Sequence, residues 1–205
     1  MKIKICGITR KEELKYLQQE QVDYAGFVLF FPKSKRNLTL DQAKELLREL
    51  PEGIESVAVV VSPDGEQMEA LLQAGFSHVQ IHGDVPVDWL MEHPVSVWKA
   101  FNVSDLEAFS EYETYDFISA YVFDASQPGS GKTFSWELLK ELPDTKKMKF
   151  LAGGLSPENV VQACQVPGIT GVDTSSGVEK EDGNGKAPEK IKAFVKAIRS
   201  NTATR

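Results

Sequence analysis

The sequence predicts a single-domain α/β protein, a (β/α)8 barrel of the TIM type, that spans residues 1–205. Short apolar segments alternate with amphipathic ones eight times, at roughly 25 residues per unit, which is close to the lower size limit of such a barrel. Strands that alternate with helices pair in parallel. The rival is an open doubly wound sheet, but no Gly-x-Gly-x-x-Gly follows the first strand and nothing divides the chain into halves.

The eight expected strands are short runs rich in apolar residues. They cover residues 2–6, 23–31, 57–61, 78–82, 95–101, 117–123, 149–152 and 169–172. In the first strand Ile3 and Ile5 alternate with Lys2 and Lys4, which is the two-residue period of a strand. The run at 23–31 is continuously apolar, as is typical of a strand that is covered on both faces.

Each strand is followed by a segment with the spacing of an amphipathic helix, in which apolar residues recur three or four positions apart. The expected helices cover residues 11–17, 40–50, 64–74, 87–92, 104–112, 135–142, 156–163 and 188–199, and residues 200–205 are expected to form a frayed tail. Thr9 and Thr39 stand where an N-cap residue is needed, so we expect each to cap the helix that follows it.

Composition excludes several classes of protein. The net charge of -7 argues against a nucleic-acid-binding protein and means that an anionic ligand must be held by local groups. No apolar run approaches the length of a membrane span, and the N-terminus leads directly into a strand without a signal-peptide core. Cys6 and Cys164 lie far apart and match no metal-binding spacing, so we expect no metal and a reducing, cytoplasmic location.

The candidate functional residues follow the expected strands, because a barrel of this type binds its ligand at the carboxyl ends of its strands. They are Cys6, Arg36, His82, Asp124, Gly154, Asp173, Ser175 and Ser176.

Four of these candidates carry groups suited to catalysis or binding, and each has a plainer interpretation. The Cys6 thiol is a nucleophile or base, or else a small buried hydrophobic residue. Asp124 follows an apolar strand, where a raised pKa would suit a general acid, or else it is a turn or capping residue. Arg36 has the geometry to bind a carboxylate through two N–H donors, although a single arginine is more often a solvated loop charge. His82 is a polar wall residue or simply a histidine with its hydrogen bonds satisfied, and it is given no catalytic role.

Glycine and serine residues after the last two strands indicate a phosphate site. Gly154 and the pair Ser175 and Ser176 allow backbone N–H groups to approach an anion at the usual phosphate position of this fold. The alternative is that they serve only tight turns. Residues 129–133 imitate the end of a P-loop, but Ser126 stands where the motif needs glycine. A mobile loop that closes over substrate is therefore the better interpretation.

Six motifs, in the right order over nearly the whole chain, resemble those of phosphoribosylanthranilate isomerases of tryptophan biosynthesis. They are Lys-Ile-Cys-Gly-Ile-Thr at 4–9, the loop at 33–36, Val-Gln-Ile-His-Gly at 79–83, Gly-Ser-Gly-Lys-Thr-Phe at 129–134, Leu-Ala-Gly-Gly-Leu at 151–155 and Gly-Val-Asp-Thr-Ser-Ser-Gly-Val-Glu at 171–179.

This resemblance implies an Amadori rearrangement without a cofactor, in which N-(5-phosphoribosyl)anthranilate becomes 1-(2-carboxyphenylamino)-1-deoxyribulose 5-phosphate. By the same resemblance Asp124 is the general acid that protonates the ring oxygen, and Cys6 is the general base that removes the C2 proton. A thiol acts as a base only when it is partly thiolate, so we expect a nearby positive charge or helix dipole to lower the pKa of Cys6.

The resemblance also assigns the binding residues. Arg36 matches the contact to the anthranilate carboxylate, and Gly154, Ser175 and Ser176 match the phosphate site. Asp173 lies where a sugar hydroxyl would be bound. The expected partner is thus a small phosphorylated substrate, with no nucleic acid or membrane, and the chain is expected to be a monomer, with a homodimer as the alternative.

Two rival functions remain at this stage. The aminoaldose isomerase of histidine biosynthesis performs the same rearrangement, but that family has an aspartate where this chain has Cys6. A non-catalytic sugar-phosphate-binding protein on the same scaffold would bind ligand without turning it over.

Overall fold

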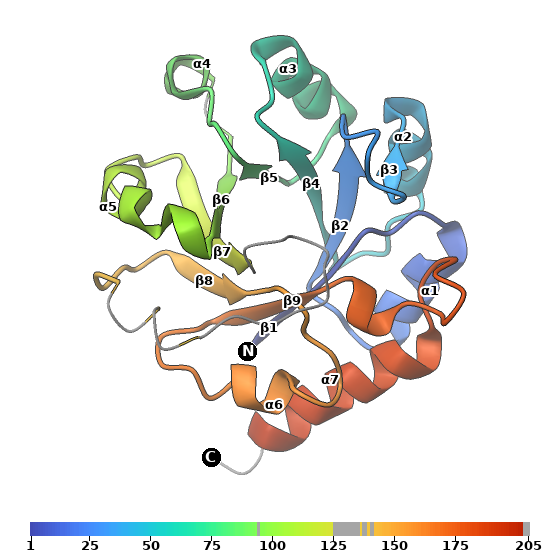
Figure 1. Ribbon diagram of the computed structural model, residues 1–205. Coiled ribbons are helices and arrows are strands. Elements are labelled where there is room, and N and C mark those ends of the chain that lie inside the picture. The colour runs from blue at the N-terminus through green and yellow to red at the C-terminus, as the bar shows by residue number, and fades with distance from the viewer. Residues whose placement is uncertain (94, 125–135, 137–138, 140–141, 203–205) are drawn as a thin grey trace.

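The structure, a computed structural model, describes residues 1–93, 95–124, 136, 139 and 142–202 (Figure 1). Its strands are β1 Lys2–Cys6, β2 Tyr24–Leu29, β3 Asn37–Leu38, β4 Glu55–Val61, β5 His78–His82, β6 Val97–Asn102, β7 Ile118–Asp124, β8 Met148–Leu151 and β9 Gly171–Thr174. Its α-helices are α1 Lys11–Gln19, α2 Leu40–Arg48, α3 Gly65–Ala74, α4 Val87–Glu92, α5 Phe109–Tyr112, α6 Val160–Ala163 and α7 Pro188–Thr202, and two 3-10 helices are η1 Val103–Ala108 and η3 Ser176–Val178.

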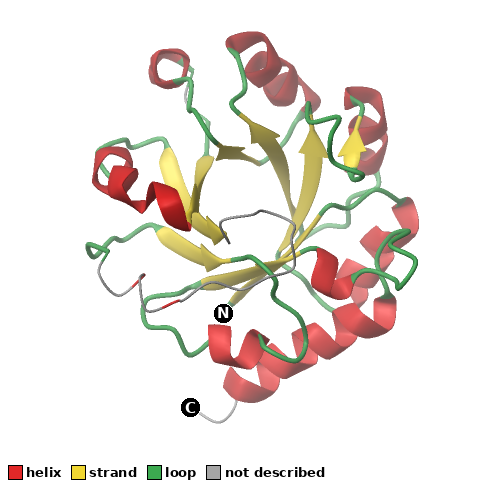
Figure 2. Ribbon diagram, viewed as in Figure 1, coloured by secondary structure: helices red, strands yellow, loops and turns green. Residues whose placement is uncertain are grey.

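The strands form a closed parallel ring with the helices outside it, as Figure 2 shows. Neighbours around the ring run β1, β2, β4, β5, β6, β7, β8 and β9, and β1 closes the ring because it pairs with both β2 and β9. At the closure Lys4 is in register with Tyr24 on one side and Asp173 on the other. The two-residue strand β3 is an addition beside the end of β2. The expected (β/α)8 barrel is confirmed.

Two packed layers hold the barrel together. Residues such as Ile5, Phe27 and Ile81 belong to the large core cluster outside the ring. Inside the ring, a smaller cluster is centred on Trp98, which stacks on Phe150 with ring centroids 4.7 Å apart. A Cβ at Gly171 would lie 2.4 Å from the Phe150 ring, so only glycine leaves room for this aromatic filling.

Of the two expected N-caps, one is present and one is not. Thr39 caps α2 as predicted, since its Oγ1 accepts the Gln42 N–H at 3.2 Å. Thr9 does not cap α1. Instead the Glu13 carboxylate accepts the N–H of Thr9 at 2.7 Å and that of Arg10 at 3.1 Å, although α1 begins at Lys11 as expected. The Glu13 carboxylate in the first turn thus accepts backbone N–H groups at the start of α1, where the Thr9 hydroxyl was expected to be the acceptor.

Three other segments also differ. The segment expected as a helix at 156–163 is helical only from Val160, because the Asn159 side chain accepts the Ser156 N–H at 2.8 Å and donates to the Gly154 carbonyl at 2.9 Å. The segment at 104–112 is η1 followed by α5. The helix α7 extends to Thr202. Most of the helix expected at 135–142, and the glycine-rich loop at 129–133, lie outside the described residues.

Candidate active site

A cavity of about 470 Å³ opens at the carboxyl ends of the barrel strands, and all eight candidate residues line it. Cys6 ends β1, His82 ends β5, Asp124 ends β7 and Asp173 lies at the end of β9. Since parallel strands present their carboxyl ends at one edge, these side chains meet although they are distant in sequence. Further lining residues include Gly153, beside the predicted Gly154, and also Gln80 and Asn102, to which sequence reasoning gave no role.

The Cys6 thiol lies above a buried ion pair. Lys4, two residues earlier on the same inward face of β1, is completely buried, and its Nζ lies 2.6 Å from Oδ2 of Asp173. The other carboxylate oxygen of Asp173 is buried without a hydrogen-bond partner among the described residues. Burial lowers the pKa of Lys4, but the Asp173 carboxylate and Cys6 raise it by more, so this pKa ends above its ordinary value. Lys4 therefore stays an ammonium ion under Cys6.

The expectation that neighbouring charge lowers the pKa of Cys6 is wrong for this structure. Burial raises the pKa of the Cys6 thiol, and the ammonium groups of Lys4 and Lys186 reverse only part of that shift, while Asp173 adds to it. The loss of hydration around a thiolate outweighs two nearby positive charges here. Without substrate, Cys6 is a thiol.

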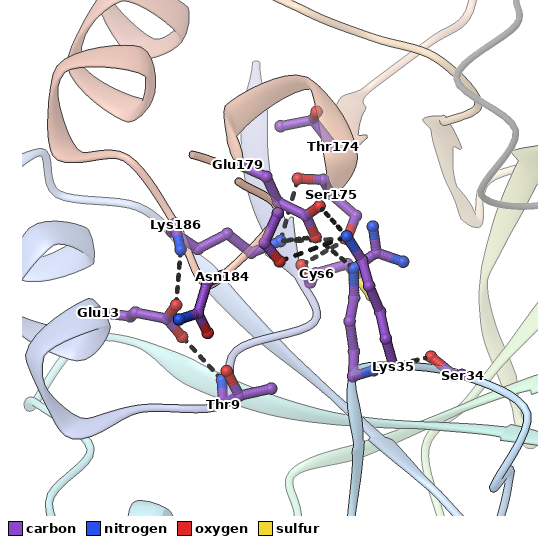
Figure 3. Close-up of polar contacts among 12 residues, drawn as sticks. Cys6, Thr9, Glu13, Ser34, Lys35, Thr174, Ser175, Glu179, Asn184 and Lys186 are labelled. Atoms are coloured by element: carbon purple, nitrogen blue, oxygen red, sulfur yellow. Dashed lines mark hydrogen bonds and ion pairs between the residues drawn. The ribbon is translucent and has the colours of Figure 1, made fainter. Parts of the chain in front are cut away.

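A single carboxylate joins the loops after β2 and β9. Glu179 accepts from Nε of Arg36 at 2.5 Å and from Nζ of Lys35 at 2.8 Å, and Lys186 Nζ approaches the same carboxylate at 3.5 Å. Figure 3 shows Lys35, Lys186 and Glu179 converging beside Ser175 and Cys6. Although burial works in the opposite direction, these cations hold the pKa of Glu179 below its ordinary value. Arg36 is thus oriented by a carboxylate of the protein rather than left as a solvated loop charge.

The loops with the expected phosphate residues are tightly built. Gly153 and Gly154 have φ angles of 80° and 66°, which favour glycine. The Ser175 hydroxyl donates to the Cys6 carbonyl at 2.9 Å, which fixes the end of β9 against the end of β1. Lys186 Nζ donates to the Ser175 carbonyl at 3.0 Å and to its hydroxyl at 3.1 Å, and burial lowers the pKa of Lys186 to about 8. A buried cation therefore adjoins the small residues of this rim.

His82 is a neutral wall residue. Burial, with help from Lys4 and Lys99, lowers the pKa of His82 to about 4. Its Nε2 lies 2.9 Å from Nε2 of Gln80, so the neutral ring accepts a hydrogen bond from the Gln80 amide. The Gln80 carbonyl oxygen is buried without a hydrogen-bond partner among the described residues. These two side chains give the cavity wall polar groups without charge.

Sequence reasoning missed Lys4, Gln80, Glu179 and Lys186. Lys4 looked like the exposed face of an alternating strand, and nothing in its pattern distinguishes a barrel interior from solvent. Glu179 and Lys186 lay inside or beside the last recognised motif, and their charges were not assigned. Among the described residues no cluster of three or more histidine, cysteine, aspartate or glutamate side chains is arranged to hold a metal ion. In the described part of the chain, no helix is both long and apolar enough to cross a membrane.

A closed (β/α)8 barrel whose mouth combines a thiol, a carboxyl group, an oriented arginine and glycine-serine loops defines the class: a barrel enzyme for a small anionic substrate. The comparisons narrow that class. The family model described as N-(5'phosphoribosyl)anthranilate (PRA) isomerase matches residues 3–197, and the chain belongs to this family.

Relatives match over essentially the whole chain. The N-(5'-phosphoribosyl)anthranilate isomerase of Aquifex aeolicus is 37% identical, covering 98% of this chain and 99% of the relative. That of Petrotoga mobilis is 38% identical, covering 98% of each.

Solved structures agree. The phosphoribosyl anthranilate isomerase of Thermus thermophilus superposes with a TM-score of 0.85 at 29% identity, covering 98% of this chain and 99% of that one. A PRA isomerase in complex with reduced 1-(o-carboxyphenylamino)-1-deoxyribulose 5-phosphate superposes with a TM-score of 0.82 at 32% identity, with the same coverage.

Proposed function

We propose that Asp124 and Cys6 act as general acid and general base in the reaction of the family to which the chain belongs. That reaction is the Amadori rearrangement of N-(5-phosphoribosyl)anthranilate to 1-(2-carboxyphenylamino)-1-deoxyribulose 5-phosphate, an aldose-to-ketose isomerisation in L-tryptophan biosynthesis. The observation that supports the assignment is the shared cavity: both groups line one space of about 470 Å³ together with the glycine and serine residues of the last two strand ends.

The reaction needs only proton transfers. Asp124 donates its proton to the furanose ring oxygen, and the C1–O bond breaks to leave a Schiff base whose nitrogen is positively charged. Cys6 then removes the proton from C2, and the electron pair flows into the C1–N iminium to form the enolamine. Loss of the 2-hydroxyl proton and return of a proton to C1 give the ketone, and Asp124 regains a proton for the next cycle.

The raised pKa of the Cys6 thiol is compatible with this role. The ring-opened substrate brings an iminium cation close to the proton that Cys6 abstracts, and a positive charge beside a thiol favours the thiolate. Lys4 and Lys186 already act in the same direction, so the bound substrate has only to overcome the remaining effect of burial. The C2 proton is itself acidified by the iminium, which lowers the basicity required.

The proposed binding contacts divide the substrate's two anionic groups. Arg36, whose Nε is held by Glu179, meets the anthranilate carboxylate. Gly154, Ser175 and Ser176 receive the phosphate, where short side chains allow backbone N–H groups to approach it.

Two further residues complete the proposed binding site. Asp173 binds a sugar hydroxyl, because its second carboxylate oxygen is buried at the cavity without a hydrogen-bond partner among the described residues. His82, held neutral, lines the wall as a polar residue that takes no part in proton transfer.

The partner is a small phosphorylated molecule, and the proposed working unit is one chain in the cytoplasm. All eight proposed site residues come from a single chain, so the site needs no second copy. A solved structure described as monomers of the dimeric phosphoribosylanthranilate isomerase of Thermotoga maritima superposes with a TM-score of 0.83 at 33% identity, so a homodimer is the alternative. Cys6 and Cys164 form no disulfide in the described structure, which suits a reducing compartment.

The test is steady-state turnover followed by loss of the fluorescence of N-(5-phosphoribosyl)anthranilate. Cys6→Ala and Asp124→Ala should each lower kcat by orders of magnitude while the proteins stay folded. Cys164→Ala is the matched control, because it removes the other cysteine, buried at the end of α6, and should leave kcat unchanged. A normal kcat in either catalytic variant would contradict its role, and faster turnover of the histidine-pathway aminoaldose would favour the rival isomerase.

A further inference from the structure

A second set of reactive side chains lies at the amino ends of four neighbouring strands, opposite the mouth that holds Cys6. Glu55 is the first residue of β4 and His78 the first residue of β5. Ser96 directly precedes β6, and Ser119 is the second residue of β7. Because the four strands are adjacent and parallel, their starting residues are brought side by side.

These four residues form a continuous chain of hydrogen bonds. Nε2 of His78 lies 2.7 Å from Oε2 of Glu55, and Nδ1 of His78 lies 2.7 Å from the Ser96 hydroxyl. The Ser96 hydroxyl in turn lies 2.6 Å from that of Ser119. Serine, histidine and carboxylate in this order, each within hydrogen-bond distance of the next, is the arrangement that activates a nucleophilic serine.

The partners determine the direction of these bonds when the His78 ring is neutral. An ionised Glu55 only accepts, so Nε2 carries the proton and Nδ1 is left as an acceptor. The Ser96 hydroxyl then donates to Nδ1, and the Ser119 hydroxyl donates to the Ser96 oxygen at 2.6 Å in preference to the Val97 carbonyl, which lies 3.3 Å away. The ring is also held in place by aromatic neighbours, with its centroid 5.8 Å from that of Tyr24 and 5.1 Å from that of Trp98.

Ser96 and Ser119 also line a separate cavity of about 760 Å³. The rest of its wall is more apolar than polar, with Leu90, Met91, Val95, Tyr115 and Phe117 beside Thr114 and Asp116. An oriented hydroxyl at the wall of a mainly apolar cavity can meet a small uncharged electrophile, whereas a phosphorylated sugar would lose hydration there and, in the described part of the chain, no lysine or arginine lines the cavity to bind its phosphate.

We propose that Ser96 is a nucleophile, activated by His78 and Glu55, that takes the acyl group of small apolar carboxylic esters in this cavity. The Ser96 oxygen attacks the ester carbonyl carbon while its proton passes to Nδ1 of His78. The tetrahedral adduct collapses, the bond from carbon to the alcohol oxygen breaks, and the leaving alkoxide takes the proton from Nδ1. Water then hydrolyses the acyl-serine by the same route, which releases the acid and restores the serine.

The chain contains a natural comparison for this site. Ser56 and Ser77 also place two hydroxyl groups next to each other, 3.3 Å apart, near the amino ends of β4 and β5. The Ser56 hydroxyl accepts the Ser77 backbone N–H at 3.0 Å, and no histidine hydrogen bond is recorded for this pair in the described structure. Serine hydroxyls without a base are poor nucleophiles. Acylation should therefore distinguish Ser96 from Ser77.

The experiment uses the full chain and p-nitrophenyl acetate. Release of nitrophenolate is followed in time, and the acetyl group is located by peptide mass spectrometry. We expect acetylation of Ser96 and not of Ser77, no acetyl group at this position in Ser96→Ala, and about 100-fold slower acetylation of Ser96 in His78→Gln, the lower end of what a general base contributes. Glu55→Gln should also slow it, to a smaller extent, since the amide oxygen still accepts from Nε2.

Isomerase activity reports the fold of each variant, because Ser96, His78 and Glu55 lie at the opposite end of the barrel from Cys6. Ser96→Ala should keep the full activity. If His78→Gln loses isomerase activity, the rate of Ser96 acetylation in the unmodified chain is compared with that in Glu55→Gln instead, because the Glu55 side chain is half exposed. Ser96 left unacetylated in the unmodified chain, or acetylated equally fast when the base is altered in a folded variant, would overturn the proposal.

Discussion

Replacing Lys4 by methionine tests whether the buried ion pair under Cys6 stabilises the barrel. Lys4 has no exposed side-chain surface, and its ammonium lies 2.6 Å from the Asp173 carboxylate, whose side chain is 7% exposed. Methionine has a similar length but no charge, so it leaves the carboxylate buried without its counter-ion. Removing one partner of a buried pair costs about 3–5 kcal/mol in the free energy of unfolding. With a urea m-value of about 3 kcal/mol/M, the unfolding midpoint should fall by about 1–1.7 M.

The same strand provides the control. Lys2 also forms an ion pair at close range, with Asp23 at 2.7 Å, but its side chain is 51% exposed. Lys2→Met should cost at most about 1 kcal/mol, because an exposed pair is weakened by water and salt. The double variant Lys4→Met with Asp173→Leu should be more stable than Lys4→Met alone, since it no longer buries a lone charge. Equal midpoints for Lys2→Met and Lys4→Met in urea unfolding would refute this reasoning.

Three further outcomes are expected. Arg36→Ala should mainly raise KM with a modest change in kcat, measured by steady-state kinetics, if Arg36 binds substrate and transition state alike; a fall in kcat alone would contradict this. In a Cys164→Ala background, the rate of Cys6 alkylation by iodoacetamide should rise with pH to a midpoint above the ordinary thiol pKa of 9.0, since burial raises the pKa of Cys6; a midpoint at or below that value would argue against burial as the dominant effect. The folded protein keeps His82 neutral down to about pH 4, whereas the unfolded chain takes up this proton near pH 6.5, so acid lowers the stability of the protein by about 3 kcal/mol through this residue. His82→Gln should remove that part of the loss between pH 7 and pH 4, as urea unfolding at the two pH values would show, and an unchanged loss would contradict it.

The periodicity of the sequence was sufficient for the barrel but not for the ends of its helices. The alternation of apolar strands and amphipathic helices depends only on which face of each element is buried. The spacing of apolar residues along the sequence shows that face directly. The cap of α1 is not Thr9 but a carboxylate three residues inside the helix, since Glu13 accepts the N–H groups of Thr9 and Arg10. The late start of α6 likewise follows from the Asn159 side chain. Such hydrogen bonds from side chains to the backbone compete with the helix's own hydrogen bonds at its ends. The spacing of apolar residues does not reveal them.

The candidate residues could be predicted because they follow the strands, and strand ends define the mouth of this fold. All eight line one cavity. The charges that surround them could not be predicted in the same way. Lys4 meets Asp173, which lies 169 positions further along the chain, only because β1 and β9 are neighbours at the closure of the ring. The direction of the Cys6 pKa shift depends on whether the effect of burial on the pKa is larger than the effect of the nearby charges. Both effects arise only in the folded interior.

The closure of the barrel between β1 and β9 has a consequence for how the chain folds while it is being synthesised. On the ribosome the first strand emerges early, while the carboxylate that neutralises Lys4 is made 169 residues later. Until then the lysine has no counter-ion with which to enter an apolar interior, so the amino-terminal strand is kept hydrated while the middle of the chain collapses. We expect a nascent chain that stops before β9 to remain open and sensitive to proteases, and the last translated strand to complete the ring.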